Sequence, residues 1–259
     1  MDNSQKNSNR ASTKFVNLKT YIGEDYSMKE AYKTLRTNLQ FCGDDVSVIA
    51  VTSCLPNEGK STISIELSKS LAELGKKVLL IDADLRKSVL VNKYADRPGI
   101  EGLSQFLSGQ AVLQDVLYST QYPNFYIIFS GTFPPNPVEL LSKTKFRDFI
   151  DNAKNTFDYI IIDCPPLGSV IDAAVVANVC DSAIMVISAN TISAKFAKGV
   201  KAQLEKSGCR ILGAVLNNIE EKNSGYYNKY YYQKYYRRYY GKYGSYGSYG
   251  NNGNNEKKG

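Results

Sequence analysis

The sequence predicts a doubly wound α/β fold around a mainly parallel sheet, and three observations support this. Short apolar runs bounded by turn residues indicate strands, and their nearly continuous apolar character is expected when helices cover both faces of a parallel sheet. Between the first two runs, apolar residues recur at helical spacing and Gly75 supplies a stop. The aliphatic pattern ends near residue 219. The expected strands are 46–53, 77–83, 125–131, 159–163, 182–188 and 211–217.

The chain divides into four predicted segments. A polar, flexible N-terminal arm is expected over residues 1–25, and a helix over 26–42, where Ala31, Leu35 and Leu39 form an apolar stripe. The α/β domain is expected over 43–222. Residues 223–259 are rich in Tyr, Gly, Asn, Ser and Lys, a low-complexity composition that predicts a disordered tail.

Composition excludes several classes of site. The chain of 259 residues contains no histidine, which rules out Ser/His triads and His-ligated metals. Its five cysteines lack metal-binding or disulfide-framework spacing, which indicates reduced thiols in a cytoplasm. No apolar run approaches the roughly 20 residues that cross a bilayer.

The positive charge is concentrated in the tail. Residues 226–259 carry seven Lys or Arg and one acid, a net +6 out of the chain's +7. The body is therefore not a basic nucleic-acid-binding domain, and no nucleic-acid partner is expected.

A phosphate-loop motif follows the first strand. The stretch "CLPNEGKST" fits G-x-x-x-x-G-K-[ST], with Cys54 in place of the first glycine, and it leads from a strand into a helix. Its backbone amides would converge on nucleotide phosphates, Lys60 would reach the β and γ oxygens, and Ser61 would bind Mg²⁺. The predicted nucleotide-binding residues here are Asn57, Glu58, Gly59, Lys60, Ser61 and Thr62.

Three carboxylates follow apolar strands. Asp82 and Asp84 come at the end of the second run, and Asp163 ends the fourth. Ligands of open parallel sheets bind at the carboxyl ends of the strands, so all three should gather beside the phosphate loop. The sequence therefore predicts a P-loop NTPase domain.

The combination of these motifs is more specific than any one of them. The phosphate loop, "IDADLR" and "IIIDCPP" resemble the Walker A, A′ and B motifs of bacterial tyrosine kinases, cytoplasmic enzymes of capsular and exopolysaccharide export whose domain is shared with MinD/ParA-like deviant Walker ATPases. In addition, "EAYKTLRTNLQF" resembles that family's oligomerisation helix, "GTFPPNPVELL" its central loop, and the tyrosine cluster its autophosphorylation tail. The likeness covers residues 27–249.

The resemblance implies a protein-tyrosine kinase with ATP and Mg²⁺ as cofactors. Lys60, Asp82 and Asp84 would be catalytic, with Asp82 near the attacking phenol and Asp84 supporting the metal and Lys60. The implied metal ligands are Ser61, Asp82 and Asp163. Arg86 would contact phosphate or a neighbouring subunit. Asn217, at the end of the last strand, is a candidate adenine contact, although strand-end asparagines are as often simple turn residues.

The resemblance also implies partners. Glu30, Lys33 and Arg36 would build a homo-oligomeric ring, with an octamer as one candidate, although Lys33 replaces the family's arginine. A transmembrane modulator of the polysaccharide copolymerase type would recruit this cytoplasmic chain to the inner face of the membrane, and a cognate tyrosine phosphatase would oppose it. The implied phosphoacceptors are Tyr226, Tyr227, Tyr230, Tyr231, Tyr232, Tyr235, Tyr236, Tyr239, Tyr240, Tyr243, Tyr246 and Tyr249.

Two alternatives remain open at this point. The chain could be a MinD/ParA-like ATPase with a tyrosine-rich interaction tail, but those enzymes carry an extra lysine where this sequence has Leu55. The tail alone could instead bind single-stranded nucleic acid or an anionic glycan by stacking and charge. Cys54, Asn57 and Cys164 also depart from the kinase pattern, and their effect on activity is open.

Overall fold

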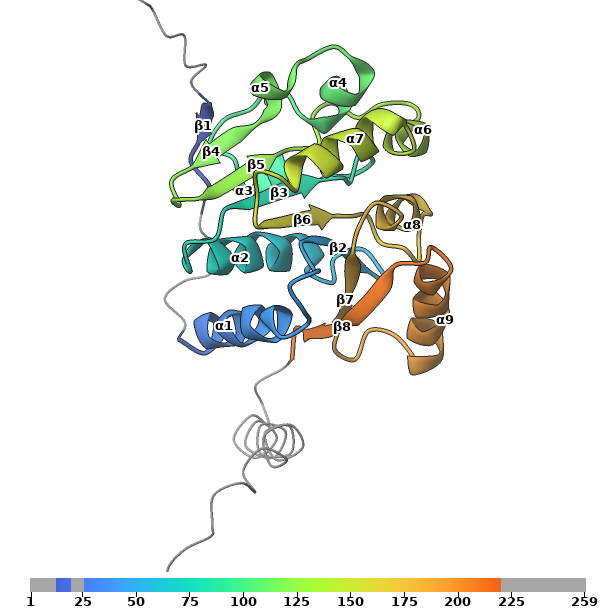
Figure 1. Cartoon of the computed structure of the whole chain (residues 1–259). Helices are drawn as coiled ribbons and strands as arrows, with labels where there is room; N and C mark the ends of the chain where they lie inside the picture. Colours follow the sequence, from blue (N-terminus) through green and yellow to red (C-terminus); the bar gives the residue numbers. More distant parts are fainter. Residues whose placement is uncertain (1–12, 20–25, 220–259) are drawn as a thin grey trace, which may run out of the picture. The chain divides into compact units, whose positions relative to one another are not determined.

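A computed structural model of the chain describes residues 13–19 and 26–219, which form one sheet covered by helices (Figure 1). Within these residues the sheet has eight strands in the order β1-β4-β5-β3-β6-β2-β7-β8, all parallel to their neighbours except the β4/β5 pair. The strands are β1 (Lys14–Val16), β2 (Val48–Ser53), β3 (Val78–Asp82), β4 (Tyr118–Thr120), β5 (Phe125–Ile128), β6 (Tyr159–Asp163), β7 (Ser182–Ser188) and β8 (Arg210–Asn217).

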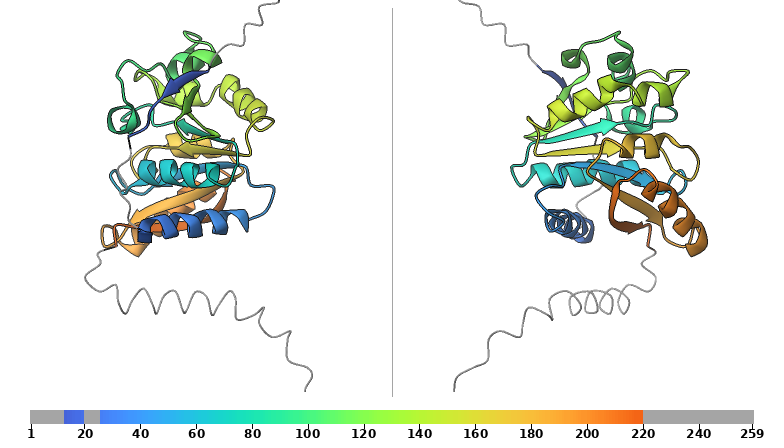
Figure 2. Two further views of the ribbon diagram at one scale, coloured as in Figure 1. Left: turned by 90° about the vertical axis from the view of Figure 1, so that its left-hand side faces the viewer. Right: turned by 45° about the vertical axis from the view of Figure 1, so that its right-hand side comes forward.

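Helices lie on both faces of the sheet (Figure 2). α1, α2 and α3 pack on one face, and α4 to α9 contribute to the hydrophobic cluster on the other. This confirms the doubly wound, mainly parallel α/β fold. The helices are α1 (Tyr26–Gln40), α2 (Lys60–Ala72), α3 (Leu90–Tyr94), α4 (Leu103–Ser108), α5 (Leu113–Val116), α6 (Pro137–Leu141), α7 (Thr144–Ala153), α8 (Asp172–Ala177) and α9 (Ala194–Glu205).

The register of the central strands decides where the polar residues meet. β2 and β3 are buried at every position, as their apolar sequences predict. Residues 78–82 of β3 run beside residues 159–163 of β6, so Asp82 is the direct partner of Asp163. The fold therefore places two carboxylates side by side at the end of the sheet from which the phosphate loop leaves β2.

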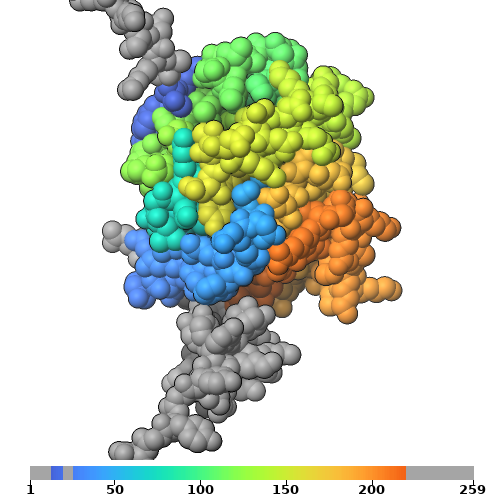
Figure 3. Space-filling view, viewed as in Figure 1, coloured from blue at the N-terminus to red at the C-terminus, as the bar shows by residue number. Residues whose placement is uncertain are grey.

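The N-terminal arm differs from its predicted form. Residues 14–16 form β1, which pairs in parallel with β4 at the edge of the sheet, where the two lie together on the surface (Figure 3). Val16 and Leu18 are 1% and 3% exposed, so burial of these two side chains supplies the reason. This part of the segment predicted to be a flexible arm belongs to the sheet.

The tyrosine-rich tail and its twelve predicted phosphoacceptors lie outside the described residues. No helix in residues 13–19 and 26–219 combines the length and apolar character that a membrane span requires.

Asp181 anchors the start of β2, the strand that leads to the phosphate loop. Its carboxylate accepts hydrogen bonds from the amides of Ser47 and Val48, at 3.0 and 2.7 Å, and Lys154 Nζ lies 2.8 Å from it. Burial alone would raise the pKa of Asp181, but Lys154 and these hydrogen bonds outweigh burial and lower it. The ionised form is therefore the one that stabilises the fold.

We expect Asp181→Asn to lower the free energy of unfolding at pH 7 by about 1–2 kcal/mol, a value reduced for partial exposure to solvent. Because the folded-state pKa lies below the usual aspartate value, this contribution is present above about pH 4 and is lost as the pH falls further. Urea unfolding at several pH values checks this, with exposed Asp151→Asn as control. A deficit of equal size at every pH would contradict the electrostatic explanation.

Candidate active site

The phosphate loop has the backbone conformation of an anion cradle. Asn57 and Gly59 have φ values of 64° and 91°, a region that glycine and asparagine adopt more readily than other residues. A Cβ atom on Gly59 would lie 2.1 Å from Asn217 Nδ2, so this position also requires glycine for space. Asn57, one of the departures from the family pattern, is thus compatible with the loop's left-handed turn.

Glu58 and Asn217, both predicted to bind nucleotide, form hydrogen bonds that stabilise the phosphate loop. The Glu58 carboxylate accepts hydrogen bonds from the amides of Leu55, at 2.7 Å, and Ser188, at 3.2 Å, and Glu58 is 2% exposed. Asn217 Nδ2 donates to the Glu58 carbonyl at 3.0 Å. The hydrogen bonds of these two side chains therefore attach the phosphate loop to the ends of β7 and β8.

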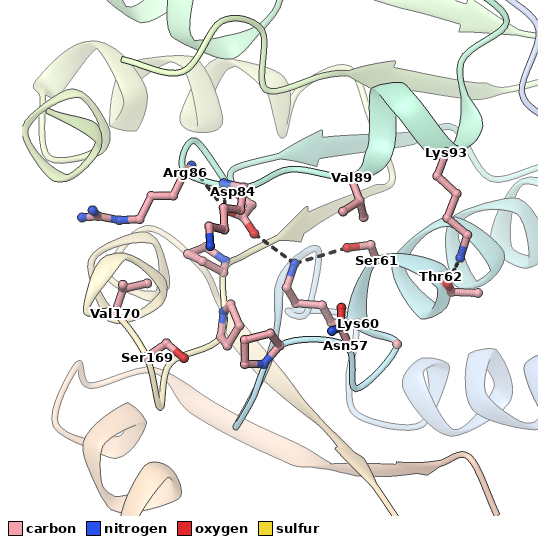
Figure 4. A pocket seen from close by; sticks show the side chains of 15 residues that line it. Asn57, Lys60, Ser61, Thr62, Asp84, Arg86, Val89, Lys93, Ser169 and Val170 are labelled. Atoms are coloured by element: carbon pink, nitrogen blue, oxygen red, sulfur yellow. Dashed lines mark hydrogen bonds and ion pairs between the residues drawn. The ribbon is translucent and has the colours of Figure 1, made fainter. Parts of the chain in front are cut away.

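Lys60 lies among the carboxylates at the ends of β3 and β6. Its Nζ is 3.4 Å from Asp84 Oδ2, 3.6 Å from Asp163 Oδ2 and 3.2 Å from Ser61 Oγ (Figure 4). Lys60 is 9% exposed; burial alone would lower its pKa, but Asp163, Asp84 and Asp82 outweigh burial and raise it. The structure thus brings together the residues that the three motifs predict.

Asp82 is completely buried. It accepts hydrogen bonds from Ser88 Oγ and from the amides of Ser130 and Asp84, at 3.3 and 3.2 Å. Burial, with a further contribution from Asp163, raises its pKa to about 7. This carboxyl can therefore hold or release a proton near neutral pH.

Asp163 has an unsatisfied oxygen. Its Oδ1 accepts from Ser64 Oγ at 3.2 Å, whereas its buried Oδ2 lies 3.6 Å from Lys60 Nζ and accepts no hydrogen bond of ordinary length from the described residues. Burial raises the pKa of Asp163, and Lys60 partly offsets this. Such an oxygen suits an outside cation or water.

A cavity of about 950 Å³ opens over Lys60. Asp84 lines it, whereas Asp82 and Asp163 lie behind its wall, so Asp84 is the predicted catalytic carboxylate that reaches the open space. Several apolar residues also line the cavity. They are Pro56, Val89, Pro165, Pro166 and Val170.

Arg86 has a partner that the sequence did not suggest. Its Nε and one terminal nitrogen donate to the two Asp172 oxygens at 2.7 and 3.0 Å, and Figure 4 shows its guanidinium turned away from Lys60. Asp172, at the start of α8, is fully buried. This ion pair ties the segment after β3 to α8.

Further residues of the site were missed because no motif marks them. Ser64 and Ser88 bind Asp163 and Asp82, and from α3, Lys93 and Tyr94 contact Thr62. A serine four residues after Lys60 lies on the same face of α2, which is the one signal that could have indicated Ser64.

The predicted oligomerisation residues lie on α1, which forms part of the surface (Figure 3). Lys33 is exposed and Glu30 is partly exposed, and the two side chains form an ion pair at 2.7 Å. Arg36 instead donates to the Ser70 carbonyl of α2 at 2.7 Å and is half-buried. Arg36 therefore holds α1 on α2, and Glu30 and Lys33 are the two available at the surface.

Comparison with known sequences places this site in a family. A family model described as an AAA domain matches residues 46–208. The tyrosine-protein kinase CpsD of Streptococcus agalactiae serotype III (strain NEM316) is 44% identical over 198 residues, covering 76% of this chain and 85% of the relative. The kinase of the same name from Streptococcus pneumoniae serotype 4 is 43% identical over 192 residues, with 74% and 85% covered.

Solved structures agree with the sequence comparison. The chimerical protein CapA2B2 superposes with a TM-score of 0.73 at 29% identity, covering 80% of this chain and 94% of that protein. The kinase domain of the Escherichia coli tyrosine kinase ETK gives 0.72 at 33% identity, with 76% and 77% covered.

A second group of structures shares the domain. The septum site-determining protein MinD of Pyrococcus horikoshii, complexed with Mg-ADP, superposes less closely, with a TM-score of 0.58 at 30% identity and 69% and 72% of the two chains covered. On these similarities and the assembled phosphate-loop site, the chain belongs to the bacterial tyrosine kinases and is a protein-tyrosine kinase built on a nucleotide-binding P-loop domain.

Proposed function

We propose that this kinase uses ATP and Mg²⁺ to phosphorylate tyrosines of its own C-terminal tail, each subunit acting on a neighbour, and so regulates capsular or exopolysaccharide synthesis and export. The observation that carries the proposal is the buried Lys60 between Asp84 and Asp163 at the base of a 950 Å³ cavity. A lysine in this position can neutralise a transferring phosphoryl group.

The chain's own residues would act as follows. The loop amides and Lys60 bind and orient the phosphates, while the apolar wall with Val89 and Pro166 excludes water around the phenol ring. Because a phenol has a pKa near 10, it needs a carboxylate to accept its proton. The proposal assigns this to the Asp82–Asp84 pair, whose member at the cavity is Asp84.

The donor set fits a magnesium ion held together with the nucleotide. No group of three Cys, Asp or Glu side chains in the described residues is arranged to hold a metal unaided. Mg²⁺ does not require one, since it commonly uses one or two carboxylates, waters and substrate phosphates. Ser61, Asp82 and Asp163 would hold it, consistent with the unsatisfied Asp163 Oδ2. When bound, the ion would stabilise charge on the phosphate oxygens.

Phosphorylation would change the sign of the tail. The tail's net charge is +6, and each phosphate adds about −1.5 to −2. Several phosphates would make neighbouring tails repel one another and loosen a ring held by α1. A transmembrane modulator would recruit the kinase to the membrane and activate it, and a tyrosine phosphatase would restore the starting state.

The MinD/ParA-like alternative is less well supported. Leu55 occupies the place of the extra lysine that such ATPases extend to their partner's nucleotide, and the Leu55 amide instead bonds Glu58 within its own loop. That reading would use the tail for interaction only and does not account for the number of tyrosines in it.

Lys60→Ala should lower phosphotyrosine formation by about 100-fold or more, because it removes the ammonium group that binds the transferring phosphate. The measurement is incubation with Mg-ATP, with the modulator's cytoplasmic segment added, followed by phosphopeptide mapping. Exposed Lys198→Ala is the matched control. Equal labelling of wild type and Lys60→Ala would refute the assigned role.

Mixing two inactive variants tests whether the phosphoryl group is transferred between subunits. A chain ending after Ser224 keeps the site without acceptors, and full-length Lys60→Ala keeps acceptors without a working site. We expect phosphotyrosine on the Lys60→Ala chain in the mixture and in neither protein alone. An active wild type together with an unlabelled mixture would argue for transfer within one subunit.

Glu30→Ala should reduce the molar mass of the assembly measured by light scattering, because Glu30 is a partly exposed charge on the proposed interface helix. Asn38→Ala, also exposed on α1, should leave the mass unchanged. If the mass of the Glu30→Ala protein equals that of the wild type, Glu30 has no role in assembly.

A further inference from the structure

The short helix α3 places two polar side chains on the first turn of α2. Lys93 Nζ lies 3.2 Å from Thr62 Oγ1, and the Tyr94 hydroxyl lies 3.0 Å from the same oxygen. Figure 4 shows Lys93 reaching down from α3 to Thr62. Thr62 and Lys93 both line the cavity, so this contact belongs to its wall.

The geometry determines what the Thr62 hydroxyl can do. A hydroxyl accepts at two lone pairs and donates one hydrogen. Lysine can only donate, and Tyr94 donates to the same oxygen, so both acceptor positions of Thr62 are occupied. Ser64 and Ser68 of α2 donate back to carbonyls four residues earlier, whereas both of these Thr62 contacts use it as an acceptor. Its one hydrogen is then available to donate, and Thr62 lines the cavity.

The position of α3 is fixed independently of any ligand. Tyr94 is 1% exposed, and the Lys19 amide donates to its carbonyl at 2.8 Å. Residue Leu18, beside Lys19, exchanges two hydrogen bonds with the side chain of Gln121, at 2.8 and 2.6 Å. The segment that forms β1 therefore also holds the wall of the nucleotide cavity.

We propose that Lys93 and Tyr94 are positioning residues of the nucleotide site. They orient the Thr62 hydroxyl as a donor to a phosphate oxygen, and the Lys93 ammonium group lies at the same wall of the cavity. The inference deepens the proposed ATP-dependent function and rests on it.

The test measures binding of the fluorescent analogue mant-ADP with Mg²⁺, and the KM for ATP, in the full chain. Tyr94→Phe and Lys93→Met should each raise the dissociation constant and the KM by about 5- to 10-fold, the effect of one hydrogen bond to the hydroxyl or its charge-assisted equivalent. Tyr118→Phe and Lys198→Met, a buried phenol and a surface lysine outside the cavity wall, should change neither.

A double-mutant cycle separates orientation from general destabilisation. On a Thr62→Val background, Tyr94→Phe should cause no further loss of affinity, because the hydroxyl it orients is gone. Lys93→Arg should retain most of the affinity that Lys93→Met loses. Additive losses, or wild-type affinity in both Tyr94→Phe and Lys93→Met, would overturn the positioning role alone. A wild type that binds no mant-ADP would overturn the proposed ATP dependence as well.

Discussion

The buried ion cluster around Lys60 is the constraint on which the rest of the site depends. The parallel register of β3 and β6 forces Asp82 and Asp163 to be neighbours, although both are almost completely buried. Two adjacent carboxylates in such a place raise each other's cost of ionisation. Lys60 offsets that repulsion, and removing one partner from a buried set of charges costs about 3–5 kcal/mol. Because Lys60 opens α2, the cluster also fixes the start of that helix.

The conformation of the phosphate loop depends in turn on the other half of the sheet. Glu58 is bonded to the Ser188 amide at the end of β7, and Asn217 at the end of β8 donates to the Glu58 carbonyl. Gly59 has room for Asn217 only because it lacks a side chain. The phosphate loop is therefore supported by β7 and β8 on one side and by the carboxylates that follow β3 and end β6 on the other. These contacts hold the loop amides in place before a nucleotide binds.

The sequence was sufficient for elements with strong local signals. The six predicted strands all occur with small shifts at their ends, and Lys60, Asp84 and Asp163 meet as the three motifs predict. β1 and β4 were missed because three-residue strands have no periodicity to detect, and their pairing depends on burial of residues distant in the sequence. The inward orientation of Glu58 and the contacts of Lys93 were missed for a related reason, since each depends on which elements pack beside the loop.

Arg86 shows how packing determines the partner of a residue that a sequence motif marks. The motif suggested a phosphate contact, but its guanidinium is bonded through two nitrogens to the fully buried Asp172. Turning Arg86 towards a nucleotide would leave the buried Asp172 carboxylate without its partner, which is unfavourable even though the Arg86 side chain is itself 40% exposed. In the proposed mechanism Arg86 keeps its bonds to Asp172, and the loop amides and Lys60 bind the phosphates.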